Sequence, residues 1–130
     1  MLITALYAGP LALWFVMLSA RIALGRRLRK LSVGDGGDPM FERMIRAQAN
    51  FAEYTPLCLL LLALLELNHY PPLLLHALGL ALLIGRLLHG YALGFARHFM
   101  LGRVLGIALT FGVLIVEGVL CLHLGLGTFG

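Results

Sequence analysis

Four long apolar stretches, separated by short polar segments, dominate the chain. A helix that crosses a bilayer needs roughly 20 mostly apolar residues, and every one of these stretches is long enough. The pattern therefore predicts an all-α fold, an integral membrane four-helix bundle, and we expect residues 1–130 to form a single domain. The predicted spans are Leu2–Leu24, Phe41–Leu67, Pro72–Phe95 and Gly102–Leu126.

The composition agrees with a membrane protein. Apolar residues make up 61% of the chain and charged residues 12%, whereas soluble domains have about 45–50% and about 25%. We therefore expect the lipid bilayer to be a partner, and the apolar content excludes a disordered chain. The net charge of +4 is dispersed, which argues against a nucleic-acid partner. Cys58 and Cys121 lie in leucine-rich runs and are expected to pack, not to form a disulfide framework.

Basic residues cluster after the first and the third predicted helix. Arg26–Lys30 is a dense basic segment, and Arg97 and Arg103 flank the third loop, while the Asn68–Pro72 turn and both chain ends carry no Lys or Arg. Cytoplasmic loops of membrane proteins are enriched in these residues. We therefore expect the basic loops in the cytoplasm and both termini outside, in the inner membrane if the protein is bacterial.

The second predicted helix carries a ladder of polar groups on one face. Its members, which fall within a sector of about 100°, are Arg43, Arg46, Asn50, Glu53 and Tyr54. A charge at membrane depth costs about 2.5–3.5 kcal/mol, so such groups usually face a bundle interior or a wet cavity. The ladder predicts a site for a polar, zwitterionic ligand. The alternative is a self-satisfied seam in which Arg46 pairs with Glu53.

Further polar groups lie on other helix faces. Gln48 projects away from the ladder and would serve another helix or a neighbouring subunit. His89 has no carboxylate at helical spacing, so packing is favoured over catalysis. Glu117 lies deep in the fourth span and needs a partner, for which Arg86 is a candidate. We expect no metal site, because the remaining histidines are scattered; they include His69, His76 and His123.

Two motifs together resemble the MAPEG family, the membrane-associated proteins in eicosanoid and glutathione metabolism. The first is the run Phe41-Glu42-Arg43-x-x-Arg46-Ala47-Gln48-x-Asn50-x-x-Glu53-Tyr54-x-Pro56-Leu57. The segment from Arg86 to Arg97, which contains His89-Gly90-Tyr91, is similar to the family's third-helix motif. The likeness is greatest to the leukotriene C4 synthase and microsomal glutathione transferase branches.

The resemblance implies a homotrimer of four-helix bundles, with glutathione as co-substrate between adjacent subunits near the cytoplasmic side. Arg26 matches an arginine near the second substrate, and Arg103 is the nearest candidate for the arginine that activates the thiol. Both are therefore the candidate catalytic residues. The positions that match glutathione-binding residues of the family are Arg46, Gln48, Asn50, Glu53, Tyr54 and Tyr91.

Two departures from the family pattern keep more than one function open. Phe95 replaces a second ligand-binding tyrosine, and Arg103 is displaced by one position, which turns a helical side chain by about 100°. The first hypothesis is a glutathione-dependent transferase or peroxidase that acts on lipophilic electrophiles or lipid hydroperoxides. The alternative is a non-catalytic glutathione- or lipid-binding scaffold. A small transporter or proton relay is less favoured, because the polar ladder stops near mid-membrane.

Overall fold

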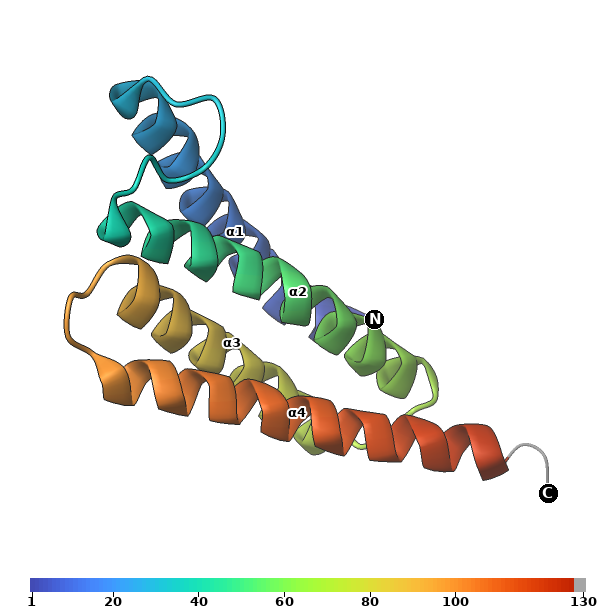
Figure 1. The fold of residues 1–130 in the computed structure, drawn as a ribbon. Helices are drawn as coiled ribbons and strands as arrows, with labels where there is room; N and C mark the ends of the chain where they lie inside the picture. Colours follow the sequence, from blue (N-terminus) through green and yellow to red (C-terminus); the bar gives the residue numbers. More distant parts are fainter. Residues whose placement is uncertain (128–130) are drawn as a thin grey trace.

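The computed structural model describes residues 1–127, which form four helices and no strand (Figure 1). The helices are α1 (Leu2–Arg29), α2 (Pro39–Leu67), α3 (Pro72–Gly94) and α4 (Met100–Gly127). All four are long and apolar enough to cross a membrane, which confirms the predicted fold class and each predicted span. α1 continues past its predicted end at Leu24, because arginine and leucine are good helix formers.

Helices α2 and α3 form the middle of the bundle. They pack on each other and both contact α1, and both contact α4, whereas α1 and α4 lie at opposite edges and do not touch within the described residues. In the most apolar 18-residue stretch of each helix, 44% of α3 is buried but only 22% of α1 and of α4. The edge helices thus turn large apolar side chains outward, a surface suited to lipid or to another subunit.

Leucine side chains fill much of the interior between the helices. In a bilayer the hydrophobic effect does little to hold helices together, since lipid tails are as apolar as leucine, so close packing has to do it. The buried cluster draws on all four helices and includes Leu11, Leu18, Phe51, Cys58, Leu62, Leu65, Leu82 and Val113. Cys58 is free and fully buried, as expected for a packing role.

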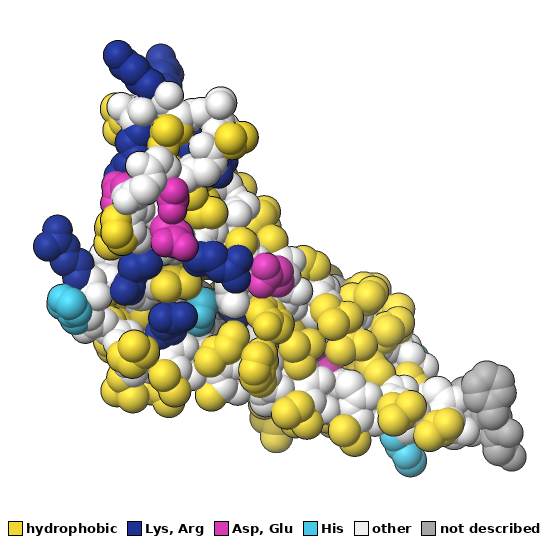
Figure 2. All heavy atoms as spheres, viewed as in Figure 1, with side chains coloured by type: hydrophobic (Ala, Val, Ile, Leu, Met, Phe, Trp, Pro, Cys, Tyr) yellow, Lys and Arg dark blue, Asp and Glu magenta, His cyan; other side chains and the backbone are white. Residues whose placement is uncertain are grey.

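The two basic loops lie at one end of the bundle. The α1–α2 and α3–α4 connections share this end, which we call the loop end, while the N-terminus and the α2–α3 turn lie at the other (Figure 1). Figure 2 shows Lys and Arg side chains gathered towards the loop end, whereas most of the coloured side chains visible towards the other end are hydrophobic. This asymmetry is the geometry on which the predicted orientation in the membrane depends.

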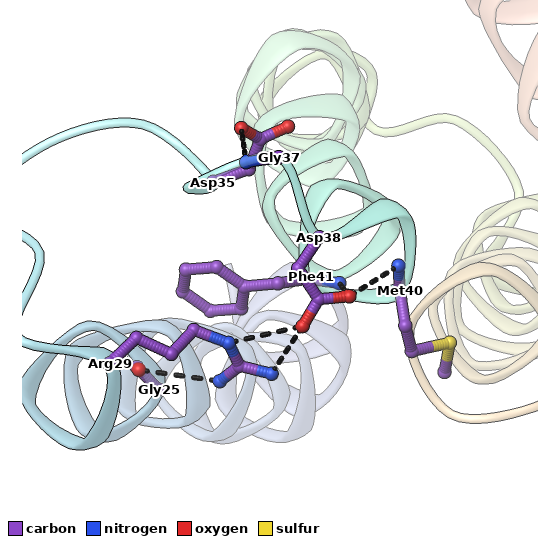
Figure 3. A network of polar contacts seen from close by, with 7 residues as sticks. All are labelled: Gly25, Arg29, Asp35, Gly37, Asp38, Met40 and Phe41. Carbon is purple, nitrogen blue, oxygen red and sulfur yellow. Dashed lines mark hydrogen bonds and ion pairs between the residues drawn. The ribbon is translucent and has the colours of Figure 1, made fainter.

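The α1–α2 loop is held by Asp38, the residue that caps the N-terminus of α2 (Figure 3). Its Oδ1 accepts hydrogen bonds from the backbone N–H groups of Met40 (3.0 Å) and Phe41 (3.3 Å). Its Oδ2 accepts two from Arg29, at 3.1 and 2.7 Å. The Arg29 guanidinium and these backbone donors lower the pKa of the Asp38 carboxyl. Arg29 thus links the end of α1 to the start of α2.

The opposite end is tied by a carboxylate from α2. Glu66 accepts hydrogen bonds from the backbone N–H groups of Ile3 (2.9 Å) and Thr4 (2.8 Å), and from the Thr4 hydroxyl. These N–H groups belong to the first turn of α1, and the N–H groups of a first turn have no acceptor within their own helix. Glu66 therefore caps a helix from a neighbouring element.

Candidate functional site

The predicted polar ladder of α2 borders a cleft between α2 and α4, near the loop end. In Figure 2 basic side chains (Lys or Arg) and a histidine lie between these two helices. The cleft consists of two adjoining hollows, which share Asn50, His89 and Arg103. We refer to the two together as the α2–α4 cleft.

One hollow is polar and the other is largely apolar. The polar hollow, of about 280 Å³, is lined by Glu42, Arg43, Arg46, Asn50, His89, Leu93 and Arg103. The apolar hollow, of about 350 Å³, is lined by Asn50, Tyr54, His89, Met100, Arg103, Val104, Ile107 and Phe111. The cleft can therefore hold an ionic group and an apolar group side by side, which is the usual make-up of a small-molecule site.

A buried arginine lies behind the cleft. Arg86 of α3 is fully buried, and its Nη2 donates to Oδ1 of Asn50 at 2.6 Å and contacts Nδ1 of His89 at 3.1 Å. Its Nη1 donates to the Thr110 hydroxyl of α4 at 3.2 Å. The suggested pairing of Arg86 with Glu117 is not seen, and the buried Glu117 carboxyl has no hydrogen-bond partner in the described structure.

Two glycines bring α3 against α4 at this point. A Cβ atom on Gly106 would lie 2.7 Å from the Gly85 carbonyl oxygen and 2.7 Å from the His89 backbone nitrogen. Side chains do not tolerate such distances, so only a glycine permits this approach. The crossing positions Arg86 and His89 against α4, within reach of Thr110 and the cleft.

The charged members of the ladder are placed in two different ways. Arg46 Nη1 lies 3.8 Å from Glu53 Oε1, and both side chains are about half exposed. This is the pair that the polar-seam alternative expects, although an exposed pair of this length contributes little to stability. Arg43 instead turns to α3, where it donates to the carbonyl oxygens of Leu93 and Ala92 and, beyond the helix, of Ala96.

Arg26 and Gln48 lie on a different face from the α2–α4 cleft. They line a hollow of about 190 Å³ between α1 and α2, together with Ser19, Ile22, Ala23 and Ile45. Gln48 Nε2 donates to the Ser19 hydroxyl at 3.4 Å, and Arg26 reaches the Gly34 carbonyl oxygen at 3.5 Å. One chain thus holds Arg26 and Gln48 apart from the predicted site residues at the cleft. We refer to this third hollow as the α1–α2 hollow.

Tyr91 lines neither hollow of the cleft. Its side chain is exposed, and its ring lies 5.8 Å from that of Phe95 and 6.3 Å from that of Phe99. Phe95 itself faces α1, where it stacks on Trp14 at 5.7 Å and lies 3.5 Å below the Arg21 guanidinium. The residue that replaces the second tyrosine therefore serves the α1–α3 contact.

The structure adds His89, Arg86 and Thr110 to the residues at the site. The sequence favours a packing role for His89, and its side chain is buried at 4% exposure, yet it also lines both hollows of the cleft. The available signal was the Arg86-x-x-His89 spacing, which puts two polar side chains on one face of α3. The spacing does not show how α3 is rotated about its axis, and this rotation is what turns the two side chains towards Asn50.

Comparisons with known proteins agree with the fold and with the extent of the motifs. The sequence profile of the MAPEG family matches residues 4–123. The inner membrane protein YecN of Escherichia coli K12 is 31% identical over 115 residues, which cover 88% of this chain and 86% of YecN. YecN of the Escherichia coli O6:H1 strain matches to the same extent. The family match extends from α1 into α4 and includes both hollows.

Proposed function

The chain belongs to the MAPEG family, and on that premise we propose that it is a glutathione-dependent membrane transferase or peroxidase. Its second substrate would be a lipophilic electrophile or a lipid hydroperoxide that enters from the bilayer. The observation that carries the proposal is the α2–α4 cleft, in which a polar hollow and an apolar hollow meet at Asn50, His89 and Arg103.

The polar hollow has the charges that glutathione needs. Glutathione is an extended tripeptide with two carboxylates, one ammonium group and a thiol. Arg46 in the lining of the polar hollow can pair with a carboxylate. Glu53 is not a lining residue, but it lies 3.8 Å from Arg46 and can accept from the ammonium or an amide. Tyr54 and Phe111, whose rings lie 5.5 Å apart, border the apolar hollow, where the second substrate would lie.

Arg103 is the proposed activator of the thiol. A free thiol has a pKa of about 8.5, and a nearby cation lowers it. The thiolate would attack the electrophilic carbon, a carbon–sulfur bond would form, and the leaving group would depart with the bonding electrons. With a hydroperoxide it would attack the terminal oxygen and release an alcohol, and a second glutathione would convert the sulfenic acid to disulfide and water.

The position of the α1–α2 hollow supports a glutathione site to which two adjacent subunits contribute residues. Arg26 and Gln48 would face the α2–α4 cleft of an adjacent copy, so that glutathione is held by two chains. A subunit interface also removes the cost of polar groups such as Gln48 facing lipid. The number of subunits, three, follows from the family resemblance.

The proposed location is the cell inner membrane, since the relative YecN is named an inner membrane protein. Both termini would lie outside and the basic loops in the cytoplasm. Single cysteines at Asp35 and Pro71, introduced after replacement of Cys58 and Cys121, can be labelled with an impermeant maleimide. Only the cysteine at position 71 should react in intact cells. Reaction at position 35 alone would show that the protein has the opposite orientation in the membrane.

A scaffold without turnover is the second candidate, and Phe95 is the observation that favours it. Its ring is committed to Trp14 and Arg21, and it has no hydroxyl to offer a ligand. Such a protein would bind glutathione or a lipid but would not form a product.

Turnover of a chlorinated dinitrobenzene and of a lipid hydroperoxide by the purified protein in detergent separates the candidates. We expect product that depends on glutathione, reduced by Arg103→Ala and unchanged by Arg27→Ala, which removes an exposed charge at the same end of the bundle. Saturable glutathione binding with no product from either substrate would support the scaffold instead.

A further inference from the structure

We infer that Arg86 is a positioning residue that sets the hydrogen-bond polarity of the α2–α4 cleft. Its contacts hold Asn50 and His89 so that both present N–H donors to a ligand, and this part of the cleft then selects an anionic, acceptor-only group such as a thiolate or a carboxylate. The inference concerns the site of the proposed function and rests on it for the identity of the ligand.

The first step is the chemistry of the guanidinium group. Arginine has five N–H donors and no acceptor, so every group that hydrogen-bonds to Arg86 must accept. Asn50 accepts through Oδ1 and Thr110 through its hydroxyl oxygen. His89 lies with Nδ1 3.1 Å from Arg86 Nη2, and it can accept there only if Nδ1 carries no proton.

The second step is what these contacts leave for the cleft. With Oδ1 bound to Arg86, Asn50 has its NH₂ group left, and this group only donates. With an unprotonated Nδ1, a neutral His89 carries its proton on Nε2, which also donates. Both residues line both hollows. We call Asn50 Nδ2 and His89 Nε2 the donor pair.

The third step is that Arg86 cannot contact a ligand itself. It is fully buried, its guanidinium carbon lies 5.9 Å from the centre of the Phe51 ring, and its Nη1 is bound to Thr110 of α4. The Thr110 hydroxyl that accepts from it donates in turn to the Gly106 carbonyl oxygen at 2.8 Å. Arg86 therefore acts through Asn50 and His89, in a network whose members have fixed directions.

The surroundings of the donor pair point to the same ligand chemistry. Arg46 and Arg103 add guanidinium donors to the polar hollow, and Glu42 is the carboxylate among its lining residues. A cationic or donor-bearing group placed at Asn50 and His89 would leave both of these N–H donors without an acceptor, which disfavours its binding. The thiolate of the central cysteine of glutathione fits this position, as a carboxylate would, whereas its ammonium group does not.

The tautomer of His89 tests the inference without any ligand. Protein labelled with ¹⁵N-histidine is recorded by long-range ¹H–¹⁵N correlation near pH 8, and His89→Gln assigns the signal among the five histidines. We expect the proton on Nε2 in the wild type and in Arg86→Lys, and a mixture of tautomers in Arg86→Met. A proton on Nδ1 in the wild type would overturn the inference, whether or not glutathione binds.

Asn50→Asp tests the polarity by ligand binding. The change is isosteric and keeps an acceptor for Arg86, so the fold should be retained, but it turns the donor that faces the cleft into an acceptor. We expect glutathione to bind at least tenfold more weakly. Asn68→Asp, the same exchange in the α2–α3 turn, is the matched control and should leave affinity unchanged.

A second pair of variants separates the two nitrogens of His89. The glutamine amide nitrogen can replace Nε2, whereas asparagine reaches only the position of Nδ1. His89→Gln should bind glutathione within about twofold of the wild type, and His89→Asn about threefold to tenfold more weakly. Unchanged binding in both Asn50→Asp and His89→Asn would overturn the inference. A wild type with the expected tautomer but no glutathione binding would instead contradict the proposed function.

Discussion

Arg103 and Arg46 border the same polar hollow, but their surroundings differ. Arg46 lies beside Glu53, with which it forms a loose ion pair, whereas Arg103 is exposed at the start of α4 and lines both hollows. A guanidinium beside a carboxylate suits the grip on a zwitterionic ligand. A guanidinium at the junction of the two hollows suits the stabilisation of a developing anion.

Arg103→Ala should therefore separate thiol ionisation from binding. Loss of the cation raises the pKa of the bound thiol, so the near-ultraviolet thiolate absorbance at neutral pH should fall while glutathione affinity changes little. Arg27→Ala is the control. If the thiolate signal and turnover survive in Arg103→Ala, the assignment is wrong, and Arg26 of an adjacent copy or Arg97 becomes the next cation to examine.

At the scale of elements, the contact between α3 and α4 decides the geometry of the cleft. The two backbones meet at Gly85 and Gly106, and this crossing turns Arg86 and His89 towards α2 and α4. The glycine at position 106 therefore determines where the side chains of Arg86 and His89 point.

Gly106→Ala should both destabilise the bundle and weaken glutathione binding. Its Cβ would lie 2.7 Å from backbone atoms of Gly85 and His89, and overpacking of this kind costs about 1–3 kcal/mol. Gly112→Ala is the matched control on the same helix, because nothing lies within 4 Å of its Cβ. Thermal unfolding in detergent should show a lower Tm than the wild type for Gly106→Ala but not for Gly112→Ala. Equal Tm values for the two variants would contradict the close approach of α3 and α4 at Gly106.

The α1–α2 loop should make stability depend on pH through Asp38. The Arg29 guanidinium lowers the pKa of this carboxyl in the folded state, so its contribution to stability is fully present above the unfolded value of about 3.9. It is lost as the pH falls through the folded value. The Tm difference between the wild type and Asp38→Asn should be constant between about pH 5 and 8 and should narrow below about pH 4. A difference that widens in acid would have the wrong sign.

For the whole molecule, the sequence was sufficient to predict the helices but not all of the site. Hydropathy sets where a chain can cross a bilayer, and the predicted and observed spans agree to within a few residues at each end. The ladder on α2 could be predicted because its members share one helix. The roles of Arg86 and His89 could not, because they depend on how α3 is rotated against its neighbours. The suggested Arg86–Glu117 pair failed for that reason.

The separation of Arg26 and Gln48 from the α2–α4 cleft predicts an assembly of several copies. Native mass spectrometry in a mild detergent should detect the homotrimer as the main species. Gln48→Glu, which introduces a negative charge, should weaken glutathione binding in the assembled protein, because Gln48 would face the ligand from the adjacent subunit. Monomers alone at every detergent concentration would contradict the shared site.

The central claim is that the α2–α4 cleft binds glutathione, and calorimetric titration of the purified protein with reduced glutathione tests it most directly. The wild type should give saturable heat. Arg46→Ala should bind about tenfold to a hundredfold more weakly, since a charge-assisted hydrogen bond contributes roughly 1.5–3 kcal/mol, and Arg27→Ala should match the wild type. Absence of saturable heat in the wild type up to about 10 mM glutathione, where even a Kd near 1 mM would be detected, would contradict the account.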